Sequence, residues 1–123
     1  MRALLLVSLL VACGGDDPQG VDTGSTCPPT PLTYASFGQA FFASYCTSCH
    51  AETVTGDARQ GAPRTIDFDT RSGVRMNTSR IDKTAAFGPD ARNHLMPPAD
   101  HPAQPTDEER RLLGEYIACE IGR

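Results

Sequence analysis

Apolar residues recur at three- and four-residue steps in two stretches of the chain, and this spacing is typical of amphipathic helices. The first stretch runs from Tyr34 to Cys46. Gly38, Phe42 and Cys46 are spaced four apart within it, so they lie along one stripe of the predicted helix. The glycine in that stripe allows a second helix to approach closely.

The second stretch lies near the end of the chain and begins with a helix-start pattern. Thr106 and Glu109 form a capping box, and the acidic first turn suits the helix dipole. Leu113, Tyr116 and Ile117 follow on one face. We expect this face to pack against the glycine-containing stripe of the first helix.

The sequence between these two predicted helices shows no regular apolar pattern. Residues 56–64 are turn-like, and Asp69 or Thr70 can cap a short helix that ends at about Met76. A further helical turn is possible at 91–94. The sequence therefore predicts loops with one or two short helices here.

The first twelve residues combine one positive charge with a mostly apolar run that is too short to span a membrane comfortably. This pattern predicts an export signal over 1–12. Its end, Leu-Val-Ala-Cys-Gly, resembles the lipobox of bacterial lipoproteins, which implies cleavage before Cys13 and lipid on that cysteine. The alternative is an ordinary signal peptide followed by a stray cysteine. The mature protein then works outside the cytoplasm, and lipidation would anchor it on the periplasmic side of a bacterial membrane.

Residues 14–33 are dominated by Gly, Pro, Asp and Thr, and hold only two aliphatic side chains. Such a segment buries too little apolar surface to offset the entropy of ordering. We therefore expect residues 13–33 to carry the lipidated cysteine and form a flexible tether. The length of 123 residues then leaves a single domain over 34–123.

Composition limits the partners and the core. The chain carries 11 basic and 15 acidic residues, and this balance argues against nucleic acid or anionic lipid as a partner. Tryptophan is absent, and 11 Gly and 10 Pro favour loops over a thick core. A large bound cofactor would supply the apolar body that the side chains lack.

The chemistry is concentrated in Cys46-Thr47-Ser48-Cys49-His50, a Cys-x-x-Cys-His motif. This motif attaches c-type haem: two thiols one helical turn apart form thioethers with one porphyrin, and the histidine offers its imidazole to the iron. The alternatives are a redox dithiol or half of a zinc site. Zinc is disfavoured because no second Cys or His pair follows at finger-like spacing.

The five cysteines can then be assigned. Cys13 is expected to carry lipid, and Cys46 and Cys49 to carry haem. The remaining Cys27 and Cys119 are predicted to form a disulfide in an oxidising compartment, with free thiols as the alternative.

In the order of its motifs, the chain from about Tyr34 to Ile121 resembles the small class I cytochromes c. The resemblance is carried by the following residues: Gly38, Phe42, Cys46, Cys49, His50, Met96, Pro97, Pro98, Leu113 and Tyr116. It implies a mainly α fold with crossed N- and C-terminal helices and short helices and loops around one covalent haem c. It also implies His50 as the proximal ligand, a methionine on the opposite face of the haem, and the carbonyl of Pro63 as the acceptor of the imidazole N–H.

Met96 is the expected methionine ligand. A thioether favours reduced iron and raises the reduction potential, and the two prolines after Met96 stiffen its loop. Met76 is the weaker candidate and is expected to pack on its short helix. His94 and His101 flank Met96 and are expected at the surface, although either can compete for the iron if the loop is remodelled.

The chain also departs from well-studied soluble members, which present lysines around the haem edge to acidic partners. Here Lys83 is the only lysine and the total charge is acidic, so the chain departs from that docking mode. Arg64, Arg80 and Arg92 are candidates to approach the haem propionates, or are simply solvated.

With both axial positions filled, the expected function is one-electron transfer between redox proteins, with no catalytic side chain. One alternative is a haem enzyme or gas sensor with an open sixth site, in which His94 or His101 acts as acid or base. A second is a haem-free lipoprotein with a Cys46–Cys49 bridge. A third is a subunit of a larger oxidoreductase.

Overall fold

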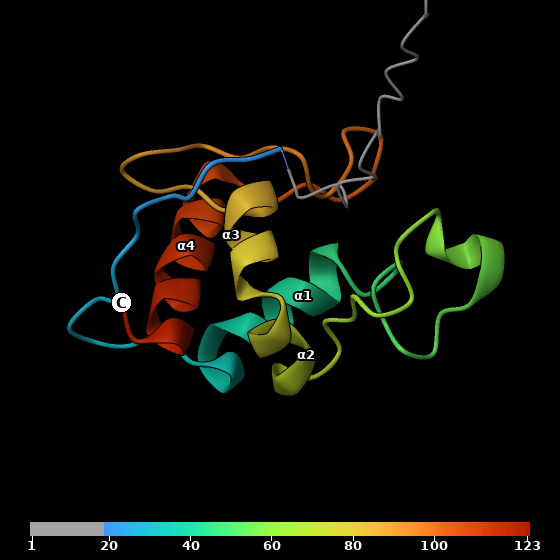
Figure 1. The fold of residues 1–123 in the computed structure, drawn as a ribbon, viewed down its shortest axis with the longest axis horizontal. Helices are drawn as coiled ribbons and strands as arrows, with labels where there is room; N and C mark the ends of the chain where they lie inside the picture. The colour runs from blue at the N-terminus through green and yellow to red at the C-terminus, as the bar shows by residue number, and fades with distance from the viewer. Residues whose placement is uncertain (1–18) are drawn as a thin grey trace, which may run out of the picture.

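The computed structural model of the protein describes residues 19–123, so the predicted export signal and Cys13 lie outside the described residues. The described part is mainly helical, as expected, and its only β pairing is an isolated bridge between Phe87 and Arg92. The elements in chain order are η1 (Tyr34–Gly38), α1 (Gln39–Tyr45), η2 (Gly56–Arg59), α2 (Arg71–Met76), α3 (Thr78–Ala85) and α4 (Asp107–Ile121) (Figure 1).

The helix predicted from Tyr34 to Cys46 is present and has two parts. Its opening turn, η1, is a wide π turn capped by a reciprocal pair: the Thr33 side chain accepts from the Ser36 N–H, and the Ser36 side chain accepts from the Thr33 N–H. The chain then continues as α1, which buries Phe41 and Phe42. The prediction of a helix here is confirmed.

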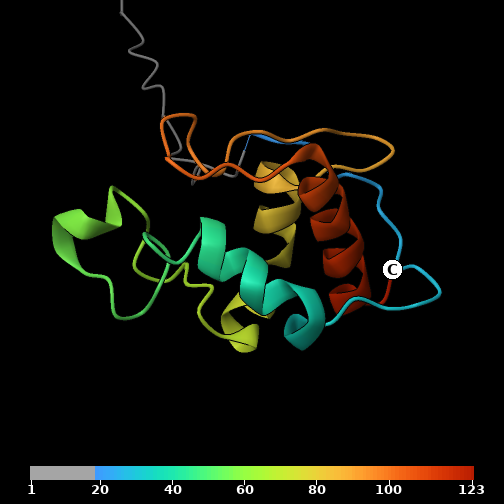
Figure 2. The same ribbon diagram turned by 180° about the vertical axis from the view of Figure 1, so that it is seen from behind.

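The predicted contact between the two terminal helices is also confirmed. Helix α4 starts with the Thr106–Glu109 capping box, and Leu113, Tyr116 and Ile117 are fully buried. A Cβ atom built on Gly38 would lie 2.9 Å from the Tyr116 ring, so only glycine allows this approach. Figures 1 and 2 show η1 beside the C-terminal half of α4, with α1 leading away from it, while α3 runs beside α4.

The short helices were predicted in part. Helix α2 begins after Thr70, whose side chain accepts from the Gly73 N–H, and it ends at Met76 as expected. The prediction of a helical turn at 91–94 was wrong. Pro89 lies in a tight turn in which the Gly88 N–H donates to the carbonyl of Ala91, 2.8 Å away, and the second short helix is α3 instead.

Residues 20–33 form an N-terminal strap, which runs over α3 and along α4 towards the C-terminus (Figure 1). Thr23 is fully buried, and its hydroxyl donates to Asp82 at 2.6 Å. Cys27 and Cys119 are joined by a disulfide. The prediction of a flexible tether over residues 13–33 is therefore wrong for the strap. Polar contacts and a covalent bond hold the strap in place, whereas the prediction considered only apolar burial.

The apolar core lies between α1, α3 and α4 and is largely aromatic. The Phe42 ring lies 5.4 Å from Phe68 and 6.3 Å from Tyr116, measured between centroids. Val74, Ile81 and Leu113 belong to the same cluster. Within residues 19–123, no helix is both long enough and apolar enough to cross a membrane.

Candidate functional site

The Cys-x-x-Cys-His segment continues the path of α1 by one further turn. The Cys46 N–H donates to the carbonyl of Phe42 at 2.9 Å, and the His50 N–H donates to the carbonyl of Cys46, also at 2.9 Å. This turn places both cysteines and His50 on the wall of one cavity. The core aromatic side chains of α1 fix the orientation of the turn.

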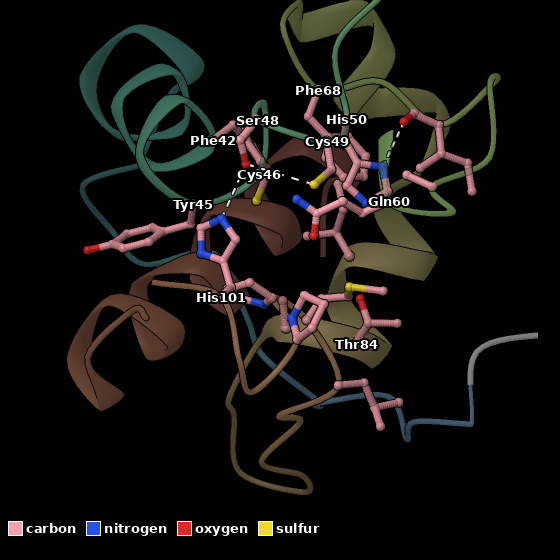
Figure 3. Close-up of a pocket in the computed structure, with 18 of the residues that line it drawn as sticks. Phe42, Tyr45, Cys46, Ser48, Cys49, His50, Gln60, Phe68, Thr84 and His101 are labelled. Atoms are coloured by element: carbon pink, nitrogen blue, oxygen red, sulfur yellow. Dashed lines mark hydrogen bonds between the residues drawn. The ribbon is translucent and has the colours of Figure 1, made fainter. Parts of the chain in front are cut away.

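That cavity has a volume of about 690 Å³. Figure 3 shows Cys49 and His50 on one side and Thr84 on the opposite side, with Tyr45 and His101 along a flank. The lining is mainly apolar and includes Phe41, Phe42, Ile66, Phe68, Ile81 and Leu113. A space of this size and character suits a flat apolar cofactor better than a small polar ligand.

The imidazole of His50 is oriented by a backbone carbonyl. Its Nδ1 atom lies 2.8 Å from the carbonyl oxygen of Ile66, which leaves Nε2 available to ligate a metal. The acceptor expected from the sequence was the carbonyl of Pro63, and that expectation is wrong. Pro63 does line the cavity, but its oxygen accepts from Arg59 at 2.6 Å and from the Ile66 N–H at 3.1 Å.

Burial lowers the pKa of His50, and the Arg59 charge lowers it further, whereas the Ile66 carbonyl and Asp67 oppose these effects. The lowered pKa favours the neutral imidazole at neutral pH. A neutral imidazole is the form that can give a lone pair to iron.

Arg59 was missed by the sequence analysis and organises the loop below His50. It is 4% exposed and forms an ion pair with Asp67 at 2.8 Å. Its guanidinium also donates to five backbone carbonyls, those of Ala51, Val54, Ala62, Pro63 and Ile66. A single arginine in a turn-rich segment gives no sequence signal of this role.

Met96 lines the same cavity as His50, whereas Met76 is 75% exposed and does not line it. The Met96 N–H donates to the carbonyl of Thr84 at 2.9 Å, and the Met96 carbonyl accepts from Arg110 at 2.8 Å. Its loop is therefore fixed to α3 and α4 through the backbone. The structure thus brings Cys46, Cys49, His50, Met96 and Pro63 to one cavity.

Comparison with known proteins assigns the family. The family model described as "Cytochrome C oxidase, cbb3-type, subunit III" matches residues 35–117. The chain belongs to this family. It is a c-type cytochrome domain, and its family implies one cofactor, a covalently bound haem c with its iron. No curated protein and no solved structure matches the chain.

The side chains of this cytochrome domain fit such a cofactor. Cys46 and Cys49 are separate thiols in the structure, which does not show the bridge considered for a haem-free lipoprotein. Burial raises the pKa of the Cys46 thiol to about 12, so it is held as a neutral thiol at neutral pH. Residues 19–123 also hold no group of three or more metal-binding side chains that would suit zinc.

The two histidines that flank Met96 differ in position. His101 lines the cavity, with Nε2 3.2 Å from the Ser48 hydroxyl (Figure 3) and Nδ1 2.7 Å from the carbonyl of Ala103. His94 lies outside the cavity lining, with its ring 4.7 Å from Phe87. Both ring nitrogens of His101 are thus engaged, which disfavours it as a ligand.

The three arginines considered as neighbours of the haem propionates also differ in whether they line the cavity. Arg80 lines the cavity, whereas Arg92 pairs with Asp107 at 2.7 Å outside it. Arg64 is exposed and does not line the cavity. Of the three, Arg80 alone remains a candidate for this role.

Proposed function

We propose that this chain is a one-electron carrier whose haem c is attached through Cys46 and Cys49 and ligated by His50 and Met96. The observation that carries the proposal is that both thiols, His50 and Met96 line a single, mainly apolar cavity. Bound haem c supplies the exchange of one electron between ferric and ferrous iron. The membership of the c-type cytochrome family supports this role over that of an enzyme.

The protein side chains have distinct tasks in this proposal. The Ile66 carbonyl keeps the His50 imidazole in one tautomer and orientation. A thioether from Met96 stabilises the reduced state and raises the reduction potential. Apolar walls such as Phe42 and Leu113 exclude water, which limits the reorganisation that accompanies electron transfer.

The proposed partners are redox proteins that act as electron donor and acceptor. The family description names a subunit of a cytochrome oxidase, which supports membrane-bound redox proteins as the partner class. The Cys27–Cys119 disulfide supports an oxidising compartment outside the cytoplasm. We propose that the mature chain begins at Cys13 and is held on a bacterial membrane by lipid on that residue.

Carbon monoxide binding tests the proposal. The chain is produced with its export signal in a bacterium that has haem-ligation machinery, and the purified protein is reduced and mixed with carbon monoxide at neutral pH. A filled sixth site predicts slow, incomplete adduct formation, and Met96→Ala should accelerate it strongly. Rapid binding by the unmodified protein would instead indicate a haem enzyme or sensor, and colourless protein would indicate a haem-free lipoprotein.

A further inference from the structure

Arg110 lies in the first turn of α4 and is 3% exposed. Its Nη1 atom donates to the carbonyls of Ala85 at 2.9 Å, Asn93 at 3.3 Å and Met96 at 2.8 Å. Its other terminal nitrogen, Nη2, donates to the side-chain oxygen of Gln104 at 3.3 Å. One side chain therefore joins α4 to the end of α3 and to both halves of the loop that carries Met96.

The charge of Arg110 has no carboxylate partner within ion-pair distance among the described residues. Arg59, the other buried arginine, is neutralised by Asp67 at 2.8 Å. Burial lowers the pKa of Arg110, while Asp107 and Cys46 raise it. A guanidinium nevertheless stays protonated at any working pH, so a positive charge persists here.

This charge acts on the cavity wall. Ala85 and Met96, whose carbonyls accept from Arg110 at 2.9 and 2.8 Å, both line the cavity, so the guanidinium lies directly behind its wall. A fixed positive charge at a partly desolvated site disfavours the ferric state more than the ferrous state, because ferric iron carries one more positive charge.

We propose that Arg110 is a positioning residue that holds the Met96 loop in place for ligation and, through its uncompensated charge, raises the reduction potential of the haem. This inference rests on the proposed ligation by Met96. It assigns two separable effects to one side chain, a geometric effect through the three carbonyls and an electrostatic effect through the charge.

Two substitutions separate these effects. Arg110→Gln removes the charge and most of the donors, whereas Arg110→Lys keeps the charge and loses the planar fork that reaches several carbonyls at once. Arg92→Gln is the matched control, because Arg92 also lies over the Phe87 ring, at 4.3 Å against 5.7 Å for Arg110, but its side chain is 61% exposed.

The experiment measures three quantities in haem-loaded protein: the near-infrared sulfur-to-iron band of the oxidised form, the carbon monoxide association rate of the reduced form, and the reduction potential. For Arg110→Gln we expect faster carbon monoxide binding and a roughly tenfold shift of the redox equilibrium towards ferric iron, which equals about 59 mV. Arg110→Lys should also bind carbon monoxide faster, with a smaller shift in potential. Arg92→Gln should match the unmodified protein in all three.

The outcomes decide between the claims. If Arg110→Gln keeps the potential and the carbon monoxide rate of the control, Arg110 is merely structural and the inference is overturned. If Arg110→Gln does not fold, Arg110→Lys decides, and a carbon monoxide rate equal to that of the control overturns the positioning role. An unmodified protein without the sulfur-to-iron band overturns the Met96 ligation and this inference together, whereas a normal band with unaffected variants overturns this inference alone.

Discussion

The Nδ1 atom of His50 lies 2.8 Å from the carbonyl oxygen of Ile66, and this contact fixes the orientation of the imidazole in the cavity. The same oxygen also accepts from Arg59 at 3.2 Å. The histidine N–H and the guanidinium therefore share one acceptor. The geometry of the candidate iron ligand depends on a buried arginine that does not touch it directly.

Replacement of Arg59 should destabilise the protein strongly. Arg59→Met leaves Asp67 without its partner and several loop carbonyls without donors, so we expect the free energy of unfolding to fall by about 3 kcal/mol. Guanidinium denaturation of haem-loaded protein measures this change. Arg64→Met, an exposed change in the same loop, is the control, and equal midpoints for the two variants would contradict the role given to Arg59.

Gly38→Ala tests the crossing of the terminal helices. The added methyl group would lie 2.9 Å from the Tyr116 ring and 3.1 Å from the Tyr34 ring, closer than packed atoms tolerate. We expect a loss of roughly 1–3 kcal/mol in the free energy of unfolding despite the better helix propensity of alanine. The neighbouring exposed change Gln39→Ala should be neutral or stabilising. Equal stability of the two variants would show that the helices do not approach at Gly38.

The disulfide between Cys27 and Cys119 closes a loop with a sequence separation of 92 residues. The double variant Cys27→Ala/Cys119→Ala should lose roughly 2–4 kcal/mol in the free energy of unfolding, because the unfolded chain gains freedom. Amide exchange should accelerate most at Thr23, which the disulfide helps to keep buried. Unchanged exchange at Thr23 would mean that its bonds to Asp82 alone hold the strap.

Glu109 should make stability depend on pH. The backbone N–H of Thr106, with the Tyr45 hydroxyl in addition, holds the pKa of Glu109 below its ordinary value of 4.5. A depressed pKa in the folded state stabilises the protein above the unfolded pKa, and this stabilisation is lost as pH falls through the folded value. The stability gap between the unmodified protein and Glu109→Gln should therefore be full above about pH 5 and shrink in acid. A gap that stays constant with pH would contradict this assignment, and the exposed change Glu52→Gln serves as control.

The terminal helices could be predicted because their apolar periodicity and caps are local signals. Thr106 and Glu109 are three residues apart in the chain, and Gly38 and Tyr116 each stand on a periodic apolar face. The cofactor motif is local too, since the thiols and His50 fall within five consecutive residues. Met96 was predicted as the methionine ligand from the family resemblance and from the two prolines that follow it.

The remaining structure depends on long-range polar contacts, which leave no periodic pattern in a sequence. Helix α3 contains mostly polar residues, and its buried Asp82 is satisfied by Thr23, 59 residues earlier in the chain. Arg59 and Arg110 are of a type that is usually exposed. Their acceptors are mainly backbone carbonyls, which every residue possesses, so their burial could not be anticipated.

The optical spectrum of the oxidised, haem-loaded protein tests the central claim most directly, with Met96→Ala compared against Met76→Ala. Met76 is the matched control because it is 75% exposed and lies outside the cavity lining. The account predicts a weak near-infrared sulfur-to-iron band in the unmodified protein and in Met76→Ala, and its loss in Met96→Ala. A band that survives in Met96→Ala, or that is missing from the unmodified protein, would contradict the ligation by Met96.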